Sequence, residues 1–291
     1  MRIAGVRSLR FLASRLRTQA RLLGLPRRRS WRVVDGKFEM ALTRDDQMDR
    51  RFYLGTYDGN LVSATAEFVR PGDTCIDIGA DVGYVTLHLA CRVGERGVVY
   101  AFEPDPRARA ILADNCARNK MGNVHIVPYA LGAEDGTATL HLSSQLGWSS
   151  MFPNELASGT VVSETKVPVR SLDGLVAANE VRLTPDRLSF VKVDCEGAEP
   201  LVLAGMRGLL RRANATLWVE INKASLEAAS ASPETVIELL TGIGYSVFWP
   251  RYRVGHHGGS NIGLSPITLD DGRSWPAHSN IVAAKPACGP E

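Results

Sequence analysis

The chain has 291 residues, is 45% hydrophobic and 22% charged, and carries a formal net charge of +3. This length and balance fit a globular protein with a sizeable core, and they exclude wholesale disorder and collagen-like structure. No run of about 18 uncharged apolar residues occurs, so the sequence predicts no helix that crosses a membrane. Five scattered cysteines without a CxxC pair indicate reduced thiols, and we expect a cytoplasmic protein with neither disulfides nor a zinc site.

The positive charge is concentrated at the start of the chain. Residues 1–32 hold ten arginines and no acidic residue, whereas the rest carries 24 basic and 31 acidic residues. On a helix over residues 3–23, the apolar residues share one face and arginines line its flank, which is typical of a segment on an anionic membrane. We therefore expect residues 1–30 to be a basic amphipathic leader at the inner membrane surface. A packed helix, a disordered tail and an organellar transit peptide are the alternatives.

A nucleic-acid partner is not expected. No aromatic residues alternate with the arginines of the leader, and the acidic remainder of the chain would repel phosphates.

Residues 31–70 predict an N-terminal hairpin and helical cap. Residues 31–43 alternate around Asp35-Gly36, a turn signal, and residues 44–70 look largely helical with a break near residues 55–60. From residue 71 onward, strand and helix patterns alternate. Such alternation predicts an α/β domain over residues 71–291, with a mostly parallel, seven-stranded sheet and helices on both faces. The expected strands are 74–78, 98–103, 124–130, 188–194, 216–221, 245–249 and 281–285, and the expected helices are 83–93, 105–119, 199–212 and 233–243.

Residues 131–187 are too long for one crossover and form a predicted insertion. It holds two further strand patterns, 137–142 and 165–169, and a polar stretch at Trp148-Ser149-Ser150. Insertions of this length are usually lids or binding loops, and an ordinary surface hairpin is the alternative. Residues 250–280 read as a loop rich in glycine and histidine, in which His256-His257 could serve as base or ligand.

The first strand of the α/β domain ends at Asp77, followed by Gly79 and Gly83. Ligands of open parallel sheets bind outside the carboxyl ends of the strands, and glycines there allow a ligand or a helix to approach closely. The dinucleotide fingerprint begins with glycine where this chain has Asp77, whose carboxylate would repel pyrophosphate and favour a sulfonium or ammonium. Glu103, at the end of the second strand, can accept both hydroxyls of a ribose.

Four segments of the chain resemble the FkbM family of S-adenosyl-methionine-dependent methyltransferases. They are DIGADVGYVTL (77–87), YAFEPDPRARAILADNCARNKMGNVHIVPYALG (100–132), VPVRSLDGLV (167–176) and FVKVDCEGAEPLVLAGM (190–206). The Asp-x-Glu-Gly-x-Glu of the last segment is the most specific of them. The resemblance implies a Rossmann-like class I methyltransferase fold and S-adenosyl-L-methionine as the cofactor.

The resemblance also implies roles for individual residues. The loop after the first strand would cradle the methionine end of the cofactor, Glu103 would hold the ribose with Pro104 and Asp105 beside it, and residues 130 and 131 would bracket the adenine. Relatives commonly have asparagine where Asp81 stands, and Tyr57 or Asp58 would replace a methionine contact of the family. The implied cofactor residues are Tyr57, Asp77, Gly79, Ala80, Asp81, Gly83, Tyr84, Glu103, Pro104, Ala130 and Leu131.

Methyl transfer to a hydroxyl needs alignment and a base that removes the proton. Acidic residues at the strand ends are the candidates, and we favour Asp194 or Glu196, with Glu220 third. Glu199 fits a charge at a helix N-terminus equally well. Lys192 would point away from its strand neighbours and could pair with one of these acids. Clustered carboxylates also suit a divalent cation, which stays an alternative.

These observations predict an O-methyltransferase that acts on a hydroxyl of a sugar, a glycolipid or a secondary metabolite. A non-catalytic scaffold, an N-methyltransferase and a dehydrogenase are the alternatives. Retention of the whole cofactor loop disfavours the scaffold, and Asp77 disfavours the dehydrogenase. Trp148, Trp249 and Tyr252 could stack on a sugar ring, although isolated aromatic residues more often serve packing.

Overall fold

The computed structural model describes residues 22–57, 59–152, 161–254, 260–268 and 275–286. The chain divides into two compact units, Met1–Gly59 and Asn60–Glu291, and each is described by itself. Most of the predicted leader, residues 1–21, lies outside the described residues. None of the helices among the described residues combines the length and the apolar character that crossing a membrane requires. The four described cysteines form no disulfide.

The first unit contains the predicted hairpin and one helix. Strands β1 (Ser30–Val34) and β2 (Phe38–Leu42) pair antiparallel, and both turn residues have positive φ, 51° at Asp35 and 64° at Gly36. Helix α2 (Gln47–Leu54) begins at Asp46, whose side chain accepts hydrogen bonds from two backbone N–H groups of its first turn. Arg29 of the predicted leader forms an ion pair of 2.9 Å with the buried Asp49.

The second unit is built on one large sheet in the order β12-β11-β13-β10-β9-β3-β4-β5. The five strands from β10 to β5 run parallel, and β13, β11 and β12 are antiparallel to their neighbours. Its strands are β3 (Thr74–Ile78), β4 (Val98–Phe102), β5 (Val124–Val127), β9 (Leu188–Val193), β10 (Thr216–Asn222), β11 (Ser246–Val254), β12 (Ser260–Pro266) and β13 (His278–Ala284).

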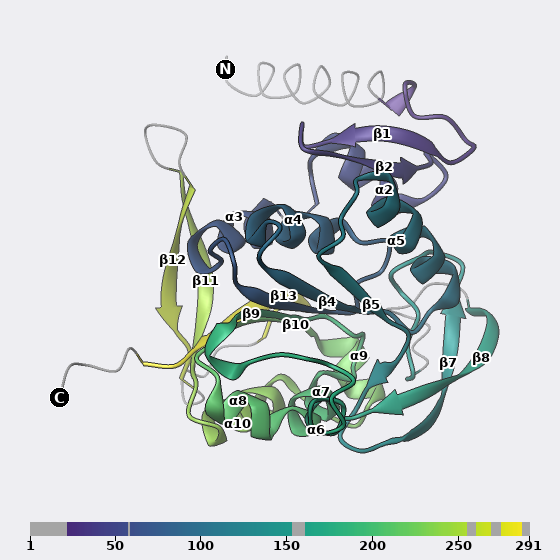
Figure 1. Cartoon of the computed structure of the whole chain (residues 1–291). Coiled ribbons are helices and arrows are strands. Elements are labelled where there is room, and N and C mark those ends of the chain that lie inside the picture. Colours follow the sequence, from purple (N-terminus) through teal and green to yellow (C-terminus); the bar gives the residue numbers. More distant parts are fainter. Residues whose placement is uncertain (1–21, 58, 153–160, 255–259, 269–274, 287–291) are drawn as a thin grey trace, which may run out of the picture. The chain divides into compact units, whose positions relative to one another are not determined.

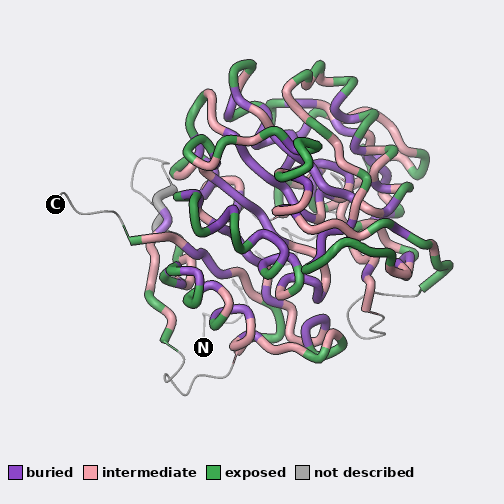
Figure 2. Tube along the Cα trace, turned by 60° about the horizontal axis from the view of Figure 1, so that its bottom comes forward, coloured by how far each residue is buried: buried purple, intermediate pink, exposed green. Residues whose placement is uncertain are grey.

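Helices cover both faces of this sheet, as the alternating pattern predicts. Helices α3 (Gly59–Phe68), α4 (Tyr84–Val93) and α5 (Pro106–Arg118) lie on one face (Figure 1). Helices α6 (Leu172–Ala177), α7 (Glu199–Gly205), α8 (Arg207–Arg212) and α10 (Pro233–Gly242) lie on the other (Figure 1). A short helix, α9 (Lys223–Ala228), follows β10 directly. Buried segments lie mainly in the interior of the molecule (Figure 2). In the central strands, Ile76, Phe102, Phe190 and Trp218 are at most 2% exposed.

The insertion forms a small sheet of its own in the order β6-β8-β7. Strands β7 (Gly136–Ser143) and β8 (Val161–Arg170) pair antiparallel, and β6 (Ala130–Leu131) runs parallel to β8. Both strands predicted within the insertion are present and longer than expected.

The structure corrects three predictions of secondary structure. The large sheet has eight strands rather than seven, because residues 260–266, predicted as loop, pair with β11; sheet pairing overrides their weak strand propensity. The predicted strand 124–130 stops at Val127 because Pro128 cannot donate a ladder hydrogen bond. The predicted helix 199–212 is two helices, because Asp173 accepts hydrogen bonds from the N–H groups of Gly208 and Leu209 and starts a new helix there.

Candidate active site at the carboxyl ends of the strands

The candidate site lies where the parallel sheet reverses its direction of growth. Strand β3 has β4 on one side and β9 on the other. After β3 the chain adds β4 and β5 toward one edge of the sheet, and it later returns to add β9 and β10 on the other side of β3. Ligands of open α/β sheets bind at this switch point, outside the carboxyl ends of the strands. The predicted cofactor residues from Asp77 to Tyr84 lie there, at the end of β3, in the loop that follows it and at the start of α4.

Two glycines of this loop are required by close packing. The Cβ of an alanine at Gly79, where φ is +74°, would lie 1.8 Å from the carbonyl oxygen of Asp194. At Gly83, where φ is +94°, it would lie 2.4 Å from a methyl group of Leu112 on α5. The backbone N–H groups of Gly79 and Ala80 donate to the carbonyl oxygen of Phe102 at 3.0 Å. The loop is therefore fixed to both neighbouring strands, β4 and β9.

Lys192 connects the cofactor loop with the predicted catalytic acids. Its Nζ donates to the carbonyl oxygen of Gly79 at 2.8 Å and lies 3.1 Å from Asp194 Oδ2 and 3.4 Å from Asp77 Oδ1. The prediction that Lys192 pairs with an acid is confirmed. Asp77 is fully buried and also accepts a hydrogen bond of 2.6 Å from Thr86. Burial raises the pKa of Asp77, and Lys192 opposes that effect.

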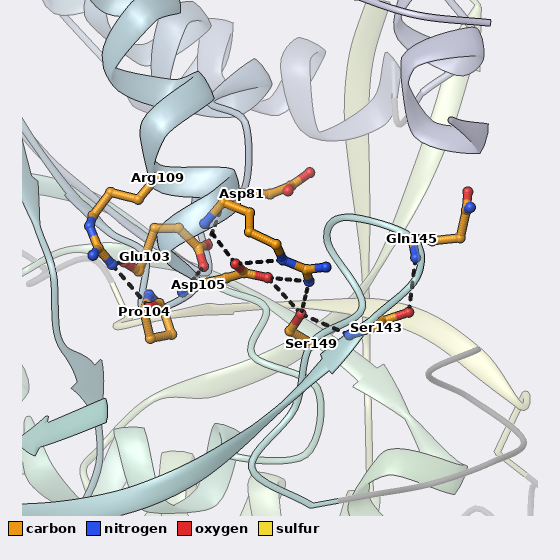
Figure 3. A network of polar contacts seen from close by, with 9 residues as sticks. Asp81, Glu103, Pro104, Asp105, Arg109, Ser143, Gln145 and Ser149 are labelled. Carbon is orange, nitrogen blue, oxygen red and sulfur yellow. Dashed lines mark hydrogen bonds and ion pairs between the residues drawn. The ribbon is translucent and has the colours of Figure 1, made fainter. Parts of the chain in front are cut away.

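Glu103 is held in place by backbone donors at the end of β4. Its two carboxylate oxygens accept hydrogen bonds from the N–H groups of Asp81 at 2.7 Å and Asp105 at 2.8 Å (Figure 3). Only 6% of the residue is exposed, and burial raises its pKa to about 7 although both hydrogen bonds favour the charged form. Asp81 has a positive φ of 48°, which turns its N–H toward Glu103. The arrangement presents a fixed carboxylate at the position expected to hold a ribose.

A polar network fixes the insertion to this edge of the site (Figure 3). Asp105 receives a hydrogen bond of 2.8 Å from the Ser149 hydroxyl and pairs with Arg107 at 2.7 Å. Burial raises the pKa of Asp105, but the hydrogen bonds from Arg107 and Ser149 outweigh it and leave the pKa below its ordinary value. The neighbouring Ser150 donates to the carbonyl oxygen of Glu196 at 2.7 Å. The segment 143–150 therefore contacts both the ribose edge and the predicted catalytic acids, which favours a binding loop over an ordinary hairpin.

Three predicted catalytic carboxyl groups meet at the ends of β9 and β10. Oxygens of Asp194, Glu196 and Glu220 lie within 4.8 Å of one another. Glu196 has a positive φ of 50°, and its Oε2 accepts hydrogen bonds from Ser225 at 3.0 Å and Asn222 at 3.5 Å. The ammonium group of Lys192, which Asp194 shares with Asp77, balances part of the negative charge here.

Crowding separates the pKa values of the three carboxyl groups. Burial raises the pKa of Asp194, but the charge of Lys192, the hydrogen bonds from Glu220 and Lys192 and the nearby His278 together outweigh it, so the net shift is downward. Burial and the negative charge of Asp194 raise the pKa of Glu196 to about 8 and that of Glu220 well above its ordinary value. The cluster therefore combines one carboxyl group whose pKa is lowered with two whose pKa values are raised, a division that suits acid–base chemistry.

Sequence reasoning missed one residue of this cluster, His278. Its Nε2 contacts Glu220 Oε1, and its side chain is 59% exposed whereas that of Glu220 is 14% exposed. His278 is the first residue of β13, which pairs with β10. No local motif marks it, because Glu220 and His278 are 58 residues apart.

Glu199 has a structural role in the turn after β9. Its two carboxylate oxygens accept hydrogen bonds of 3.0 Å from the N–H groups of Cys195 and Gly197. Burial raises its pKa to about 7. Glu199 is also the first residue of α7, so its interpretation as a charge at a helix N-terminus fits the structure better than a catalytic role.

The remaining predicted site residues are placed as follows. Ala130 and Leu131 are buried in β6 shortly after β5, and the carbonyl oxygen of Pro104 accepts a hydrogen bond of 2.9 Å from Arg109 (Figure 3). Tyr57 belongs to the first unit, where its ring packs on Phe52 with a centroid distance of 4.9 Å. The contacts of these four predicted residues (Ala130, Leu131, Pro104 and Tyr57) with the cofactor stay predictions. Asp58, His256, His257 and the side chain of Tyr252 lie outside the described residues, and Trp249 packs on Trp275.

Comparison with known proteins identifies the family. The model of the FkbM methyltransferase domain matches residues 77–247, more than half of the chain, and the chain therefore belongs to the FkbM methyltransferase family. This is a family of S-adenosyl-methionine-dependent methyltransferases. No curated protein sequence matches the chain.

Solved structures similar to the chain are methyltransferases of distant sequence. A precorrin-6y C5,15-methyltransferase from Geobacter metallireducens is 13% identical, with 87% of this chain and 98% of that chain covered and a TM-score of 0.43. An S-adenosyl-methionine-dependent O-methyltransferase from Thermotoga maritima is 15% identical, with coverages of 81% and 68% and a TM-score of 0.40. An FkbM methyltransferase from Methylobacillus flagellatus is 15% identical, with 94% of this chain and 60% of that chain covered and a TM-score of 0.40.

Proposed function

We propose that this member of the FkbM family transfers a methyl group from S-adenosyl-L-methionine to a hydroxyl of a sugar, a glycolipid or a secondary metabolite. The observation that carries the proposal is the cluster of Asp194, Glu196 and Glu220 at the same end of the sheet as the cofactor loop. A hydroxyl needs a base to become a good nucleophile, and the raised pKa values of Glu196 and Glu220 make their carboxylates stronger bases than ordinary glutamates.

The charges around the loop after β3 fit a cationic cofactor. Asp77, Asp81 and Glu103 lie in or against this loop, and Lys192 is the cation that contacts Asp77. A surplus of carboxylates suits the sulfonium and ammonium groups of S-adenosyl-methionine and would repel a pyrophosphate. In this proposal the loop holds the methionine end and Glu103 accepts the ribose hydroxyls.

The chain's own residues would orient the acceptor and accept its proton. Bound S-adenosyl-methionine supplies an electrophilic methyl group, and the transfer mainly requires that the attacking oxygen be aligned with it. The segment 143–150, held by Asp105 and by the backbone of Glu196, would close over the acceptor and limit its access to water. The carboxyl cluster would then take the hydroxyl proton.

We also propose that the acceptor is presented at an anionic membrane surface. In the described part of the first unit, Leu23 and Val33 are 76% and 63% exposed, and Arg27 and Arg28 are exposed as well. Apolar and basic side chains together suit a membrane interface rich in anionic lipids. Deleting residues 1–30 should release the protein from phosphatidylserine-containing vesicles in a flotation assay, and unchanged binding would contradict the proposal. The deletion also removes Arg29 and so breaks its ion pair with Asp49. The double variant Arg27→Gln with Arg28→Gln keeps that ion pair, changes only exposed charges and is the matched test.

The experiment that tests the function is transfer of a labelled methyl group. The protein is incubated with S-adenosyl-methionine labelled in its methyl group and with fractionated extract of the source cells. We expect label in a methyl ether, identified by mass spectrometry as O-linked. An N-methyl product would support the N-methyltransferase alternative, and binding of the cofactor without any transfer would support the scaffold.

A further inference from the structure

His278 and Glu220 stand out among the buried and half-buried titratable groups because they join the carboxyl cluster to solvent. Glu220 Oε1 contacts His278 Nε2, whereas Glu220 Oε2 is buried within the cluster. The same carboxyl group shares a hydrogen bond with Asp194, so Glu220 lies between the other acids and the histidine. The His278 ring extends from this contact to a largely exposed position.

The pair is held by the fold rather than by flexible loops. Glu220 lies within β10, opposite Asn280 of β13, and His278 lies opposite Asn222, two residues further along β10. Side chains two residues apart on a strand share one face of the sheet, so the antiparallel register brings His278 to Glu220. Backbone pairing continues beyond the two residues, because Lys223 N donates to the carbonyl oxygen of Ala277 at 3.0 Å.

One oxygen of each of the other two carboxyl groups of the cluster already has a partner. Glu196 Oε2 accepts hydrogen bonds from Ser225 and Asn222, and Asp194 Oδ2 is paired with Lys192. Both oxygens of Glu199 accept backbone hydrogen bonds. Glu220 differs from the other acids because its carboxyl group also contacts a histidine that reaches solvent. The charged and titratable groups that face Glu220 are Lys192 on β9, Asp194 and Glu196 in the turn after β9, Glu199 on α7 and His278 on β13.

We propose that Glu220 is the catalytic residue that takes the acceptor's hydroxyl proton and that His278 is the positioning residue through which this proton leaves to solvent. The inference rests on the proposed function. The acceptor's O–H bond breaks as its oxygen bonds to the methyl carbon, and the electron pair of the broken carbon–sulfur bond stays on sulfur. The proton moves to the Glu220 carboxylate and from there to His278 Nε2, and the resulting imidazolium releases a proton to water.

Nuclear magnetic resonance tests the pair without cofactor or acceptor. The chain has six histidines, so the imidazole signal lost in His278→Gln identifies His278 in ¹⁵N spectra. We expect the ¹⁵N signals of the His278 imidazole to shift in Glu220→Gln, because the carboxylate oxygen that contacts Nε2 is replaced. Unchanged His278 signals in this variant would overturn the pairing.

Labelled methyl transfer, with extract of the source cells as the acceptor pool, tests the path of the proton. His278→Gln and His278→Ala should lower turnover at pH 7 about 100-fold or more. The rising limb of the pH–rate profile should move to higher pH, because Glu220 loses its proton acceptor. Imidazole added to His278→Ala should restore part of the rate, since the position is exposed to solvent.

The control variant is His125→Gln, an exposed histidine on the edge strand β5, which should leave the rate unchanged. Calorimetry with S-adenosyl-methionine separates this inference from the proposed function. All His278 variants should bind the cofactor as the wild type does, and a wild type that binds none contradicts the proposed function instead. Wild-type turnover and an unchanged pH profile in both His278 variants would overturn the inference.

Discussion

Two glutamates at the same end of the sheet have different neighbours, and these neighbours suit them to different roles. Glu103 after β4 accepts hydrogen bonds from two backbone N–H groups, whereas Glu220 on β10 faces the carboxyl groups of Asp194 and Glu196 and a histidine. Backbone donors fix a carboxylate as an acceptor, which suits holding a ribose. Carboxyl and imidazole neighbours can exchange protons, which suits catalysis.

Lys192 lies between these two regions and makes each dependent on the other. It contacts Asp77 and Gly79 on the cofactor side and Asp194 on the catalytic side, with a side chain that is only 4% exposed. The proposed binding region and the proposed catalytic region are therefore distinct in chemistry and share one buried cation. Substitutions should therefore affect either one region alone or both together.

Gly79→Ala should have the largest effect, because the new Cβ would lie 1.8 Å from the carbonyl oxygen of Asp194. We expect the free energy of unfolding to fall by about 4 kcal/mol or more in chemical denaturation. The control is Gly122→Ala, where nothing lies within 4 Å of the new Cβ, and it should change stability by less than about 0.5 kcal/mol. Equal stability of the two variants would contradict the close packing of β3 against β9.

Lys192→Met should disturb both regions at once. Removing one partner of a buried ion pair destabilises proteins by about 3–5 kcal/mol, because it leaves the other charge unpaired. The loss should be larger at pH 8 than at pH 5, since protons can neutralise Asp77 and Asp194 at the lower pH. Denaturation at both pH values measures this difference. A loss that does not vary with pH would show that Lys192 acts through packing alone.

Stability should fall as pH rises from about 5 to about 8. Burial raises the pKa of Glu103 and Glu199 to about 7 and that of Glu196 to about 8 in the folded chain. Each binds a proton more tightly in the folded than in the unfolded state, so the stabilisation present at low pH is lost as pH passes through these values. Glu196→Gln should flatten the slope measured by thermal unfolding. Stability that rises with pH over this range would contradict the burial of these groups.

Ser149→Ala should have the smallest effect. It removes a hydroxyl that donates to Asp105 at 2.8 Å and accepts longer hydrogen bonds of 3.3 Å from Arg107 and from the Ser143 N–H, for which we expect a loss of about 1 kcal/mol. The change should appear as faster hydrogen exchange in segment 143–150 while the parallel strands keep their protection. Gln145 lies in the same segment and donates its backbone N–H to the Ser143 hydroxyl (Figure 3). Gln145→Ala keeps this backbone hydrogen bond and does not touch the Ser149 hydroxyl, so it is a suitable control. Identical exchange in both variants would show that Ser149 does not hold the segment.

Local patterns predicted most of the parallel sheet and of the cofactor loop. Strand β3 has the predicted bounds, 74–78, because apolar residues bounded by turn signals suffice to define a buried strand. The orientation of Lys192 followed from strand alternation alone. His278 and the strand β12 could not be predicted, because each is defined by pairing with a distant segment: β13 with β10, and β12 with β11.

Calorimetric titration with S-adenosyl-methionine tests the central claim most directly. We expect one cofactor molecule to bind per chain and NAD to give no heat. Glu103→Gln should weaken binding about 10-fold or more, because an amide replaces a charged acceptor of the ribose hydroxyls. His278→Gln should bind as the wild type does. Absence of binding to the wild type, or equal binding by Glu103→Gln, would contradict the assignment of this loop and this carboxylate to the cofactor.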